Sequence, residues 1–420
     1  MIKSSAFGKI LFNAFGKLLT ALVTFFSLKI IGKELGMADY GLWTQLLFAV
    51  KILMPLVLMQ LETVLVRFYQ SNTHNAKQQW AGLFISILGF NLLISSPLLV
   101  FPHESANYIF GAAGYTHFLP FICLLILTES VLLFLISFFR AKAETYQFTS
   151  IRILQSSLQL ITLVSLLYYR QESLEIIISV FIGINIVICL PLFGWIAIKY
   201  SLIQSLKQLN RYSLLFFMRY GLPLTISGFS TWLIYASDRF FIAYFHDLAL
   251  VGLYAAMSIY GSLAFMLLDA FNLLVLPQCV SLWEQGKAPH ALNYAKKMSN
   301  NYLILAGLGL VLVILIGPQL LMHLSSEAFK SDAFWLALLT FSYLLPGFDQ
   351  RHITPLYLMG STHKFAFVSV SVAMLNLVLN FLLIPNLGIQ GAILSTLISY
   401  LLRSLWLWWM HKYNVRFRFK

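Results

Sequence analysis

The sequence predicts an all-α integral membrane protein with about 12 transmembrane helices in two six-helix lobes and with both termini in the cytoplasm. Three observations lead to this fold class. Hydrophobic residues make up 60% of the chain and charged residues only 10%, and the mean hydropathy is +0.82. Apolar runs long enough to cross a hydrocarbon core of roughly 30 Å recur along the whole chain, which leaves no separate soluble domain. The lysines and arginines gather in alternate loops.

Hydropathy and helix-breaking residues place the expected spans at Ile10–Ile31, Gly41–Gln60, Trp80–Phe101, Tyr115–Phe139, Gln147–Tyr169, Leu174–Tyr200, Gly221–Phe245, Leu250–Leu276, Asn301–His323, Ala333–Leu358, His363–Ile384 and Gly388–Met410. Lys17 and Lys29 interrupt the first apolar run, so we interpret it as a retained span rather than a removed signal peptide. An even number of spans puts both ends on one side. With that side in the cytoplasm, the outer loops hold only Lys33, Arg170 and Lys330, as the positive-inside rule predicts.

Several function classes are disfavoured by composition and motifs. The formal net charge of +13 follows the membrane topology, so no nucleic-acid partner is expected. Cys123, Cys189 and Cys279 all fall in or at the end of apolar runs, so neither a disulfide framework nor a metal site is expected. The chain lacks the Gly-x-x-x-x-Gly-Lys-Ser/Thr phosphate loop of ATP-hydrolysing proteins. All of its loops are short, which favours a transporter over an enzyme.

An internal repeat divides the chain. Residues 35–43 and 246–254 each place an acidic residue and then Gly-Leu-aromatic at the outer end of a span. A shorter echo pairs residues 146–148 with 363–365. The repeat predicts two halves of the same orientation, as in transporters built from parallel repeats. We therefore expect an N-terminal six-helix lobe over residues 1–200, a cytoplasmic linker over 201–220 and a C-terminal six-helix lobe over 221–420.

Polar side chains recur at helical spacing in three spans. They are Asn13, Lys17, Thr20 and Thr24 in the first, Ser227, Thr231, Tyr235 and Asp238 in the seventh, and Tyr254, Ser258 and Asp269 in the eighth. Such stripes line an aqueous cleft or supply hydrogen bonds between helices. Hydrogen bonding between helices is the simpler explanation for the hydroxyls alone. A charge at membrane depth costs roughly 2.5 to 3.5 kcal/mol, so the charged members favour the cleft.

Further charges lie inside expected spans. Lys51 and Glu129 are deep, whereas Arg152, Arg351 and Arg403 are close enough to the cytoplasmic surface to extend to it. Asp238 and Arg239 allow two interpretations, as groups of the cleft or as a structural lock at its outer end. Neighbouring residues on a helix point about 100° apart, so we expect the two to have no partner in common. Asp238-Arg239 lies in the outer third of its span and Asp269 in the inner third, so they are treated as separate sites.

Several short motifs carry a resemblance to a known family. Tyr220-Gly221-Leu222-Pro223, the run Ser-Asp-Arg-Phe-Phe-Ile at 237–242 and Val-Gly-Leu-Tyr at 251–254 resemble the middle of the Wzx-type polysaccharide flippases. Leu35-Gly36, Tyr-Gly-Leu-Trp at 40–43 and Val-Arg-Phe at 66–68 resemble the N-terminal signature of that family. These flippases belong to the MOP exporter superfamily, which also contains the MATE transporters. The resemblance covers most of the chain.

The resemblance implies a function and a fold. The fold is MATE/MOP-like, with two six-helix lobes around a central cavity. The function is translocation of undecaprenyl-pyrophosphate-linked oligosaccharide repeat units, of O-antigen or a related surface polysaccharide of lipopolysaccharide biosynthesis. The unit moves from the cytoplasmic to the periplasmic leaflet of a bacterial inner membrane by alternating access. Only the Ser-Asp-Arg motif at Ser237–Arg239 is carried over from the family by position.

The chemistry of this substrate suggests a role for each candidate residue. Lys17, Lys51 and Arg239 are candidate cavity cations for the pyrophosphate. Trp43, Tyr235, Tyr254 and the polar residues of the three stripes are candidates for sugar contacts. Asp269, Glu129 and Asp238 are candidates for proton or Na⁺ coupling, because a buried carboxylate can exchange protons. No metal or other cofactor is expected. Expected partners are the lipid-linked oligosaccharide, membrane lipids, a polysaccharide polymerase and a chain-length regulator.

Two alternatives stay open at this point. A cation-coupled multidrug extruder of the same fold would favour acidic and aromatic cavity residues over lysines. A membrane-embedded glycan polymerase or glycosyltransferase is disfavoured, because the chain has neither a long outer loop nor an Asp-x-Asp motif.

Overall fold

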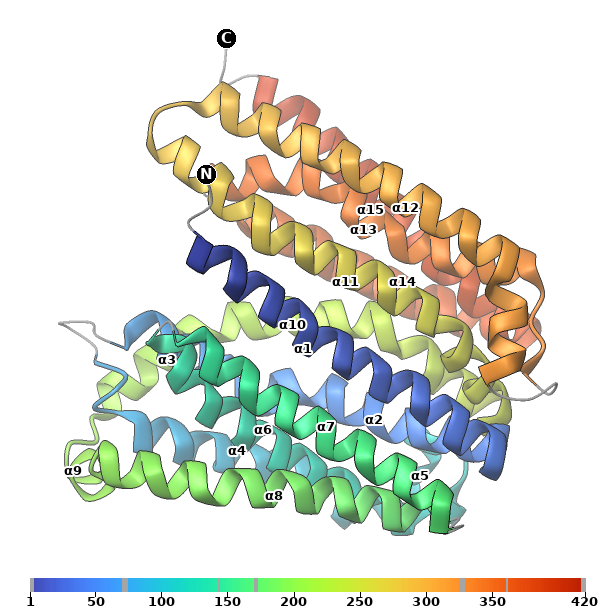
Figure 1. Cartoon of the computed structure of the whole chain (residues 1–420), viewed down its shortest axis with the longest axis horizontal. Helices are drawn as coiled ribbons and strands as arrows, with labels where there is room; N and C mark the ends of the chain where they lie inside the picture. The colour runs from blue at the N-terminus through green and yellow to red at the C-terminus, as the bar shows by residue number, and fades with distance from the viewer. Residues whose placement is uncertain are drawn as a thin grey trace. The chain divides into compact units, whose positions relative to one another are not determined.

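The computed structural model describes residues 4–69, 75–142, 144–169, 173–324, 329–359 and 362–416, and every regular element in these ranges is a helix (Figure 1). Inside the helices, some side chains are also not described. Among them are those of Asn13, Lys17, Ser227 and Asp269.

The helices of the first half are α1 (Ser4–Ser27), the π-helical segment η1 (Leu28–Leu35), α2 (Met37–Leu58), α3 (Leu61–Phe68), α4 (Trp80–Val100), α5 (Pro102–Phe110), the 3₁₀ segment η2 (Ala113–Phe118), α6 (Leu119–Ala141), α7 (Thr145–Tyr169) and α8 (Leu174–Lys199). The six expected spans of this half coincide with α1, α2, α4, α6, α7 and α8. Proline at the start of α5 suits a helix end, because its missing N–H would have no partner there.

The helices of the second half are α9 (Leu202–Lys207), α10 (Arg211–Phe245), α11 (Leu248–Glu284), α12 (Ala288–Leu324), α13 (Ala333–Leu358), α14 (Thr362–Leu387) and α15 (Ile389–Arg416). Residues 211–220, expected to be a linker, continue the helix that crosses the membrane. Asn210 begins this extension, because its side-chain oxygen accepts a hydrogen bond from the Tyr212 N–H at 2.9 Å. Residues expected to form the next cytoplasmic loop are also largely helical, at the end of α11 and the start of α12.

Eight segments in the described part of the chain are long and apolar enough to cross a membrane. They correspond to α2, α4, η2 with α6, α8, α11, α12, α14 and α15. The other four expected spans coincide with α1, α7, α10 and α13, which are long helices of lower hydropathy. On α12, Ile304 and Leu315 expose more than half of their side chains, as expected for a helix that faces lipid. The all-helical multi-pass membrane fold is confirmed.

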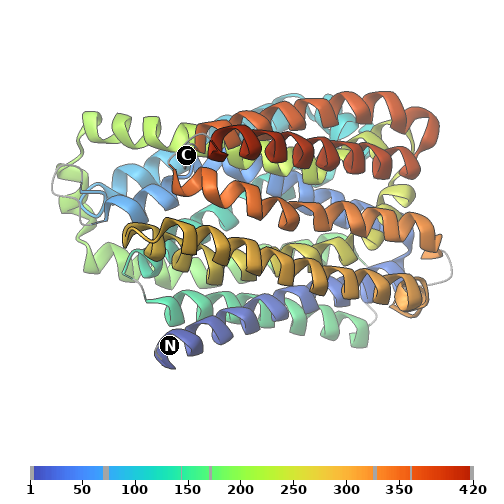
Figure 2. The same cartoon turned by 90° about the horizontal axis from the view of Figure 1, so that it is seen from above.

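The chain forms two compact units. Unit 1 comprises Met1–Leu35 and Leu42–Trp232, and unit 2 comprises Gly36–Gly41 and Leu233–Lys420. In unit 1, α1 packs along α7, and α6 packs against α3, α4 and α8 (Figure 2). Trp80, Phe134 and Phe138 are buried and in edge or tilted ring contact in its core.

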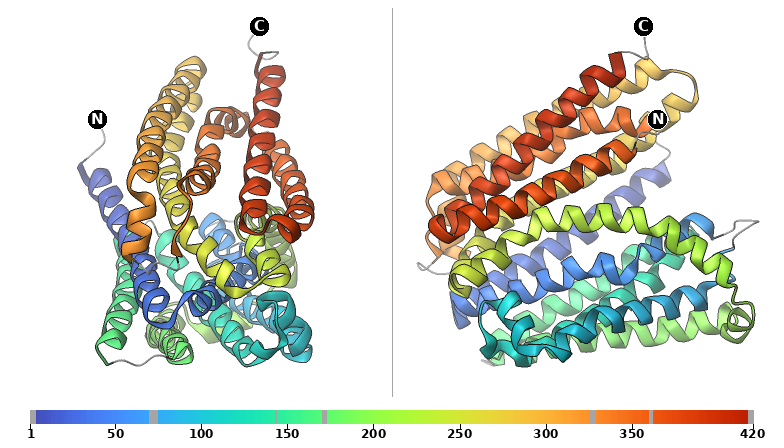
Figure 3. Two further views of the ribbon diagram at one scale, coloured as in Figure 1. Left: turned by 90° about the vertical axis from the view of Figure 1, so that its right-hand side faces the viewer. Right: turned by 180° about the vertical axis from the view of Figure 1, so that it is seen from behind.

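Unit 2 is built around α13. This helix packs against α11, α12 and α15, and α15 also packs along α14 (Figure 3). Its core includes Val275, Cys279 and Tyr302, which α11 and α12 supply. The side chains that form the candidate site of this unit come from α10, α11, α14 and α15.

The two glycines of the internal repeat meet within unit 2. A Cβ added to Gly41 would stand 1.8 Å from the carbonyl oxygen of Leu248, and one added to Gly252 would stand 2.2 Å from that of Met37. Gly41 therefore faces the carbonyl of Leu248, four residues before Gly252, and Gly252 faces the carbonyl of Met37, four residues before Gly41. Only a residue without a side chain allows the first turns of α2 and α11 to touch by their backbones. The repeat detected in the sequence thus marks a close and reciprocal helix contact.

Candidate functional site

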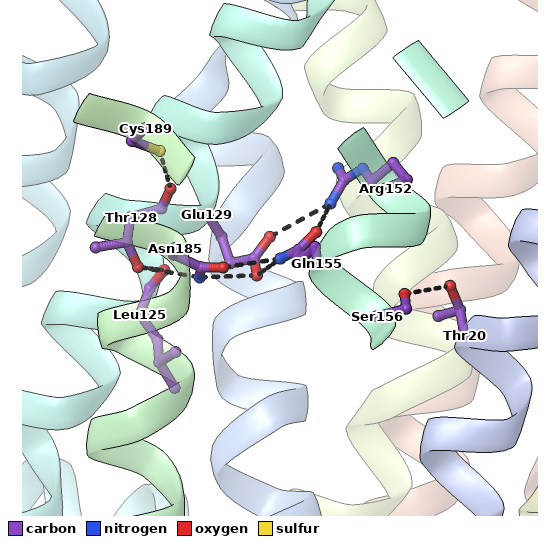
Figure 4. A network of polar contacts seen from close by, with 9 residues as sticks. All are labelled: Thr20, Leu125, Thr128, Glu129, Arg152, Gln155, Ser156, Asn185 and Cys189. Carbon is purple, nitrogen blue, oxygen red and sulfur yellow. Dashed lines mark hydrogen bonds and ion pairs between the residues drawn. The ribbon is translucent and has the colours of Figure 1, made fainter. Parts of the chain in front are cut away.

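The polar side chains of the membrane helices form two separate networks, one inside each unit. The first, the Glu129 network, consists of Glu129 on α6, Arg152 and Gln155 on α7, and Asn185 on α8 (Figure 4). Glu129 Oε1 accepts hydrogen bonds from Gln155 Nε2 at 2.8 Å and from Asn185 Nδ2 at 3.0 Å. Its other oxygen lies 3.7 Å from a terminal nitrogen of Arg152. The carboxylate therefore has a partner on each of two neighbouring helices.

The two charged side chains of the Glu129 network are partly exposed. The Glu129 side chain keeps 22% of its surface exposed and that of Arg152 keeps 27%. Arg152, predicted to extend to the cytoplasmic surface, pairs with Glu129 instead and donates to Gln155 Oε1 at 2.8 Å. A carboxylate at membrane depth attracts the guanidinium more strongly than water does at the end of a long side chain. The network therefore pairs a partly exposed carboxylate with a partly exposed cation.

The second, the Asp238 network, surrounds Asp238 of α10 in unit 2. Asp238 is fully buried. One carboxylate oxygen accepts hydrogen bonds from the Tyr254 hydroxyl on α11 at 2.5 Å and from Thr396 Oγ1 on α15 at 2.7 Å. The other accepts one from Asn380 Nδ2 on α14 at 2.8 Å. A buried carboxylate is tolerated only when it is well hydrogen-bonded, and four helices are held together by this one.

The hydroxyl of Ser237 extends the network along α14. Ser237 Oγ donates to Asn376 Oδ1 at 3.0 Å and accepts from Asn380 Nδ2 at 3.1 Å. Asn376 in turn donates to Ser399 on α15 at 3.2 Å. The side chains of Ser237 and Asp238, the first two residues of the Ser-Asp-Arg motif, therefore both form hydrogen bonds inside unit 2.

Arg239 is 1% exposed and packs beside the same tyrosine. A terminal nitrogen donates to the Tyr235 carbonyl at 2.9 Å, and the guanidinium carbon lies 5.2 Å from the centre of the Tyr254 ring. The expectation that Asp238 and Arg239 share no partner is wrong. Tyr254 contacts both, because its hydroxyl and its ring face are separate recognition surfaces.

The predicted cation Lys51 lies apart from both networks. It is exposed on α2 in unit 1, and its ammonium group lies 4.9 Å from the centre of the Phe48 ring and 6.0 Å from that of Trp232. Aromatic rings at this distance hold a cation by its charge without covering it. Of the predicted cavity cations with a described side chain, Lys51 is the accessible one and Arg239 the buried one.

Some predicted hydroxyls bond between helices or within their own helix. Thr20 of α1 lies 3.0 Å from Ser156 of α7, a contact visible in Figure 4. Thr24 donates to the Thr20 carbonyl at 3.4 Å, and Ser258 to the Tyr254 carbonyl at 2.7 Å. The first contact joins two helices, and the other two are hydrogen bonds to the carbonyl one turn earlier, which can bend a helix.

The predicted aromatic residues lie in ring clusters. Trp43 is 2% exposed and makes an edge contact with Phe181, with ring centres 5.2 Å apart. Tyr235 packs on Phe265 with ring centres 4.9 Å apart, and Thr231 is exposed on the same helix. The structure does not describe the side chains of Asn13, Lys17, Ser227 and Asp269. Among the described residues, no group of three or more His, Cys, Asp or Glu is placed to hold a metal ion.

Several network residues were missed from the sequence. They are the amides Gln155, Asn185, Asn376 and Asn380. The charges of Asp349 and Arg403 are evident in the sequence, but the buried ion pair that they form was not predicted. In that pair, Arg403 Nε lies 3.1 Å from Asp349, although Arg403 was predicted to reach the surface. A signal was present, because an amide or acid in the middle of an apolar helix needs a partner as much as a charge does.

Glu62 was also missed. It follows the break between α2 and α3, where Met59 and Gln60 both have positive φ angles of 48° and 55°. The Glu62 side chain is buried, and one of its oxygens accepts a hydrogen bond from Thr63 Oγ1 at 3.1 Å. Its other oxygen has no partner among the described residues. The expected span Gly41–Gln60 ends at this break, and the short helix α3 that carries Glu62 was not predicted.

Comparison with known proteins places the chain in a family. The model of the family described as "Polysaccharide biosynthesis protein" matches residues 7–279. No curated protein sequence is significantly similar to the chain.

Solved structures share its fold at low sequence identity. An inward-facing multidrug resistance MATE family transporter of the MOP superfamily is 14% identical over 96% of each chain, with a TM-score of 0.72. The lipid II flippase MurJ in an inward closed conformation is 15% identical over 96% of this chain and 87% of its own, with a TM-score of 0.68. A mutant of the MATE transporter VcmN from Vibrio cholerae is 18% identical over 99% and 98%, with a TM-score of 0.65.

These findings agree with the resemblance seen in the short motifs. The fold is that of the MATE and MOP transporters, and the family match covers well over half of the chain. The chain thus has the fold of these membrane proteins, and it belongs to the polysaccharide biosynthesis protein family.

Proposed function

We propose that this protein is a flippase for undecaprenyl-pyrophosphate-linked oligosaccharide repeat units of O-antigen or a related surface polysaccharide. It moves the sugar head group from the cytoplasmic to the periplasmic leaflet of a bacterial inner membrane by alternating access. The observation that carries the proposal is the family match over residues 7–279, on a chain with the fold of membrane transporters. The polyprenyl tail stays in lipid throughout, so only the polar head group has to cross.

The proposal assigns different roles to the predicted cations. Lys51 contacts the pyrophosphate, because its ammonium group is exposed and lies beside two aromatic rings. Lys17 is the second candidate for this role by its place in the sequence. Arg239 has a structural role instead, because it is buried against Tyr235 and Tyr254.

Coupling to a proton or Na⁺ is assigned first to Glu129. Its side chain is partly exposed and carries a displaceable ion pair, which is what a carboxylate needs to exchange an ion during a transport cycle. Asp269 stays a candidate by sequence. Once flipped, the repeat unit would be consumed by a polysaccharide polymerase working with a chain-length regulator.

The test is complementation of a deletion strain. Wild-type protein should restore surface polysaccharide, whereas Lys51→Ala and Lys17→Ala should restore less than about a tenth of it at equal protein in the membrane, since a lost charge contact to phosphate costs about 1.5 to 3 kcal/mol. Lys287→Ala is the matched control, because Lys287 is an exposed lysine on the loop between α11 and α12. It should restore the wild-type amount.

Two outcomes would count against the proposal in different ways. Wild-type polysaccharide in both lysine variants would remove the cationic mechanism. Unchanged polysaccharide in the deletion strain, together with increased susceptibility to drugs, would replace the flippase with a multidrug extruder.

A further inference from the structure

A cluster of three lysines lies outside both networks, at the end of unit 1 predicted to face the cytoplasm. A cavity of about 720 Å³ opens there between the ends of several helices. Lys77 lines it from the segment before α4, Lys142 from the end of α6 and Lys199 from the end of α8. The one acidic residue among its lining residues is Glu144, which lies 3.9 Å from Lys142. The cavity therefore carries an excess of positive charge.

The three lysines converge on two aromatic rings. The Lys77 and Lys142 ammonium groups lie 5.7 Å and 5.4 Å from the centre of the Tyr200 ring. Lys199 lies 4.2 Å and Lys142 5.6 Å from the centre of the Trp195 ring. Lys142 and Lys199 are near enough for their charges to interact. Like charges brought together in this way lower their energy when an anion binds among them.

The floor of the cavity is rigid. Tyr200 stacks on Phe138 with ring centres 5.1 Å apart, and its hydroxyl lies 2.9 Å from that of Tyr69. Burial raises the pKa of both tyrosines, and the hydrogen bond to Tyr200 raises that of Tyr69 further. Both hydroxyls therefore stay protonated at neutral pH. They add neutral hydrogen-bond donors beside the cations.

The wall formed by α9 is fixed by hydrogen bonds to the segment before α4. Ser205 Oγ donates to the Gln78 carbonyl at 2.8 Å, and Gln79 Nε2 donates to the Gln208 carbonyl at 2.6 Å. Ser201 has a φ of 47°, which turns the chain sharply between α8 and α9 and is costly for a residue other than glycine. These hydrogen bonds join α9 to the segment that carries Lys77, so two walls of the cavity are fixed to each other.

We propose that this cavity, the Lys77–Lys142–Lys199 site, binds a phosphate group carried by a lipid at the cytoplasmic membrane surface. Three ammonium groups and two tyrosines line the same cavity, and they match the charge and acceptor oxygens of a phosphate. Two lipids present this group, an anionic phospholipid of the membrane and the pyrophosphate-linked polyprenyl chain. The site is distinct from Lys51, and its argument does not depend on the proposed flippase function.

The test counts bound lipid by native mass spectrometry on the full protein purified in neutral detergent. One arm adds phosphatidylglycerol and the other adds undecaprenyl pyrophosphate, each with phosphatidylcholine as a zwitterionic competitor of no net charge. The triple variant Lys77→Gln, Lys142→Gln, Lys199→Gln should bind the recognised lipid roughly 100-fold more weakly, at about fivefold for each lysine. The control carries Lys287→Gln, Lys296→Gln and Lys297→Gln, which remove the same charge from exposed positions of unit 2. It should bind as the wild type does.

Glu144→Gln provides an independent measurement in the opposite direction. Removing the one carboxylate of the site should strengthen binding several-fold. Loss in the phosphatidylglycerol arm alone would assign the site to membrane lipid, and loss in the undecaprenyl pyrophosphate arm alone would assign it to the polyprenyl-linked lipid. Equal loss in both arms would mean that the site recognises the shared phosphate. Binding in both arms that is the same in the triple variant, the control and Glu144→Gln would overturn the proposal.

Discussion

The Glu129 and Asp238 networks stabilise a carboxylate among membrane helices in different ways. Each holds one carboxylate in the interior of a membrane-helix bundle. Glu129 has an ion pair with Arg152 and 22% of its side chain exposed, whereas Asp238 has three hydrogen-bond donors and no exposed surface. Arg239, the neighbour of Asp238 in sequence, is packed on tyrosine rings. An accessible carboxylate with a separable cation suits ion exchange, and a fully satisfied one suits a lock.

The comparison changes the meaning of the Ser-Asp-Arg motif. The motif is the part of the chain that most resembles the flippase family, and it contains two adjacent charges in a membrane helix. In the structure, all three of its side chains make contacts within unit 2. We therefore assign the motif to the stability of the helix bundle, and we propose Lys51 and Glu129 for the chemistry of transport.

The largest effect should come from Asp238→Ala. The change removes the acceptor of three buried hydrogen bonds, from Tyr254, Asn380 and Thr396, and removes the negative charge next to Arg239. We expect a loss of about 3 to 5 kcal/mol in the free energy of unfolding. Equilibrium unfolding in mixed detergent micelles measures it. Asp247→Ala is the matched control, because Asp247 is exposed and caps α11 by accepting from the Leu250 N–H, so it should cost about 1 kcal/mol. Equal losses in the two variants would refute the lock.

A smaller loss should follow Tyr254→Phe. The ring that packs against Arg239 stays in place, and only the hydroxyl that donates to Asp238 is removed. We expect about 1 to 3 kcal/mol in the same unfolding measurement. Tyr244→Phe, on the exposed surface of α10, should have no measurable effect. If Tyr254→Phe behaves like Tyr244→Phe, the hydrogen bond to Asp238 does not stabilise the bundle.

The smallest effect on stability should come from Glu129→Gln. The ion pair with Arg152 is partly exposed, so its loss should cost less than about 1 kcal/mol. Transport should nevertheless lose its response to an imposed proton or Na⁺ gradient, which can be measured in proteoliposomes made with and without the gradient. A variant that keeps the full response of the wild type would exclude Glu129 from coupling.

The sequence predicts most of the fold but less of the site. The lengths of the apolar runs are enough to place the long helices, because a membrane span needs a fixed length of apolar chain. The short helix α3 and the extension of α10 through residues 211–220 were not predicted, since both depend on contacts with neighbouring helices. Glycine and an acidic residue at matching positions did reveal the repeat, and Gly41 and Gly252 meet in the structure.

Charge alone was not enough to sort the candidate residues. From the sequence, Asp238 and Glu129 are both carboxylates in apolar helices. Their difference lies in the partners that other helices bring, such as Asn380 and Thr396 for the first and Gln155 for the second. These amides and hydroxyls are far apart in the chain, so their convergence follows only from the packing of the helices.

The central claim is that this protein moves a pyrophosphate-linked sugar across a membrane and that Lys51 contacts the phosphates. The most direct measurement uses purified protein in liposomes that contain a fluorescent undecaprenyl-pyrophosphate-linked oligosaccharide, with the labelled head group quenched from outside. Wild-type protein should make the inner-leaflet fraction accessible to the quencher, and Lys51→Gln should slow this at least tenfold while Lys287→Gln does not. Accessibility in wild-type liposomes equal to that in protein-free liposomes would contradict the claim.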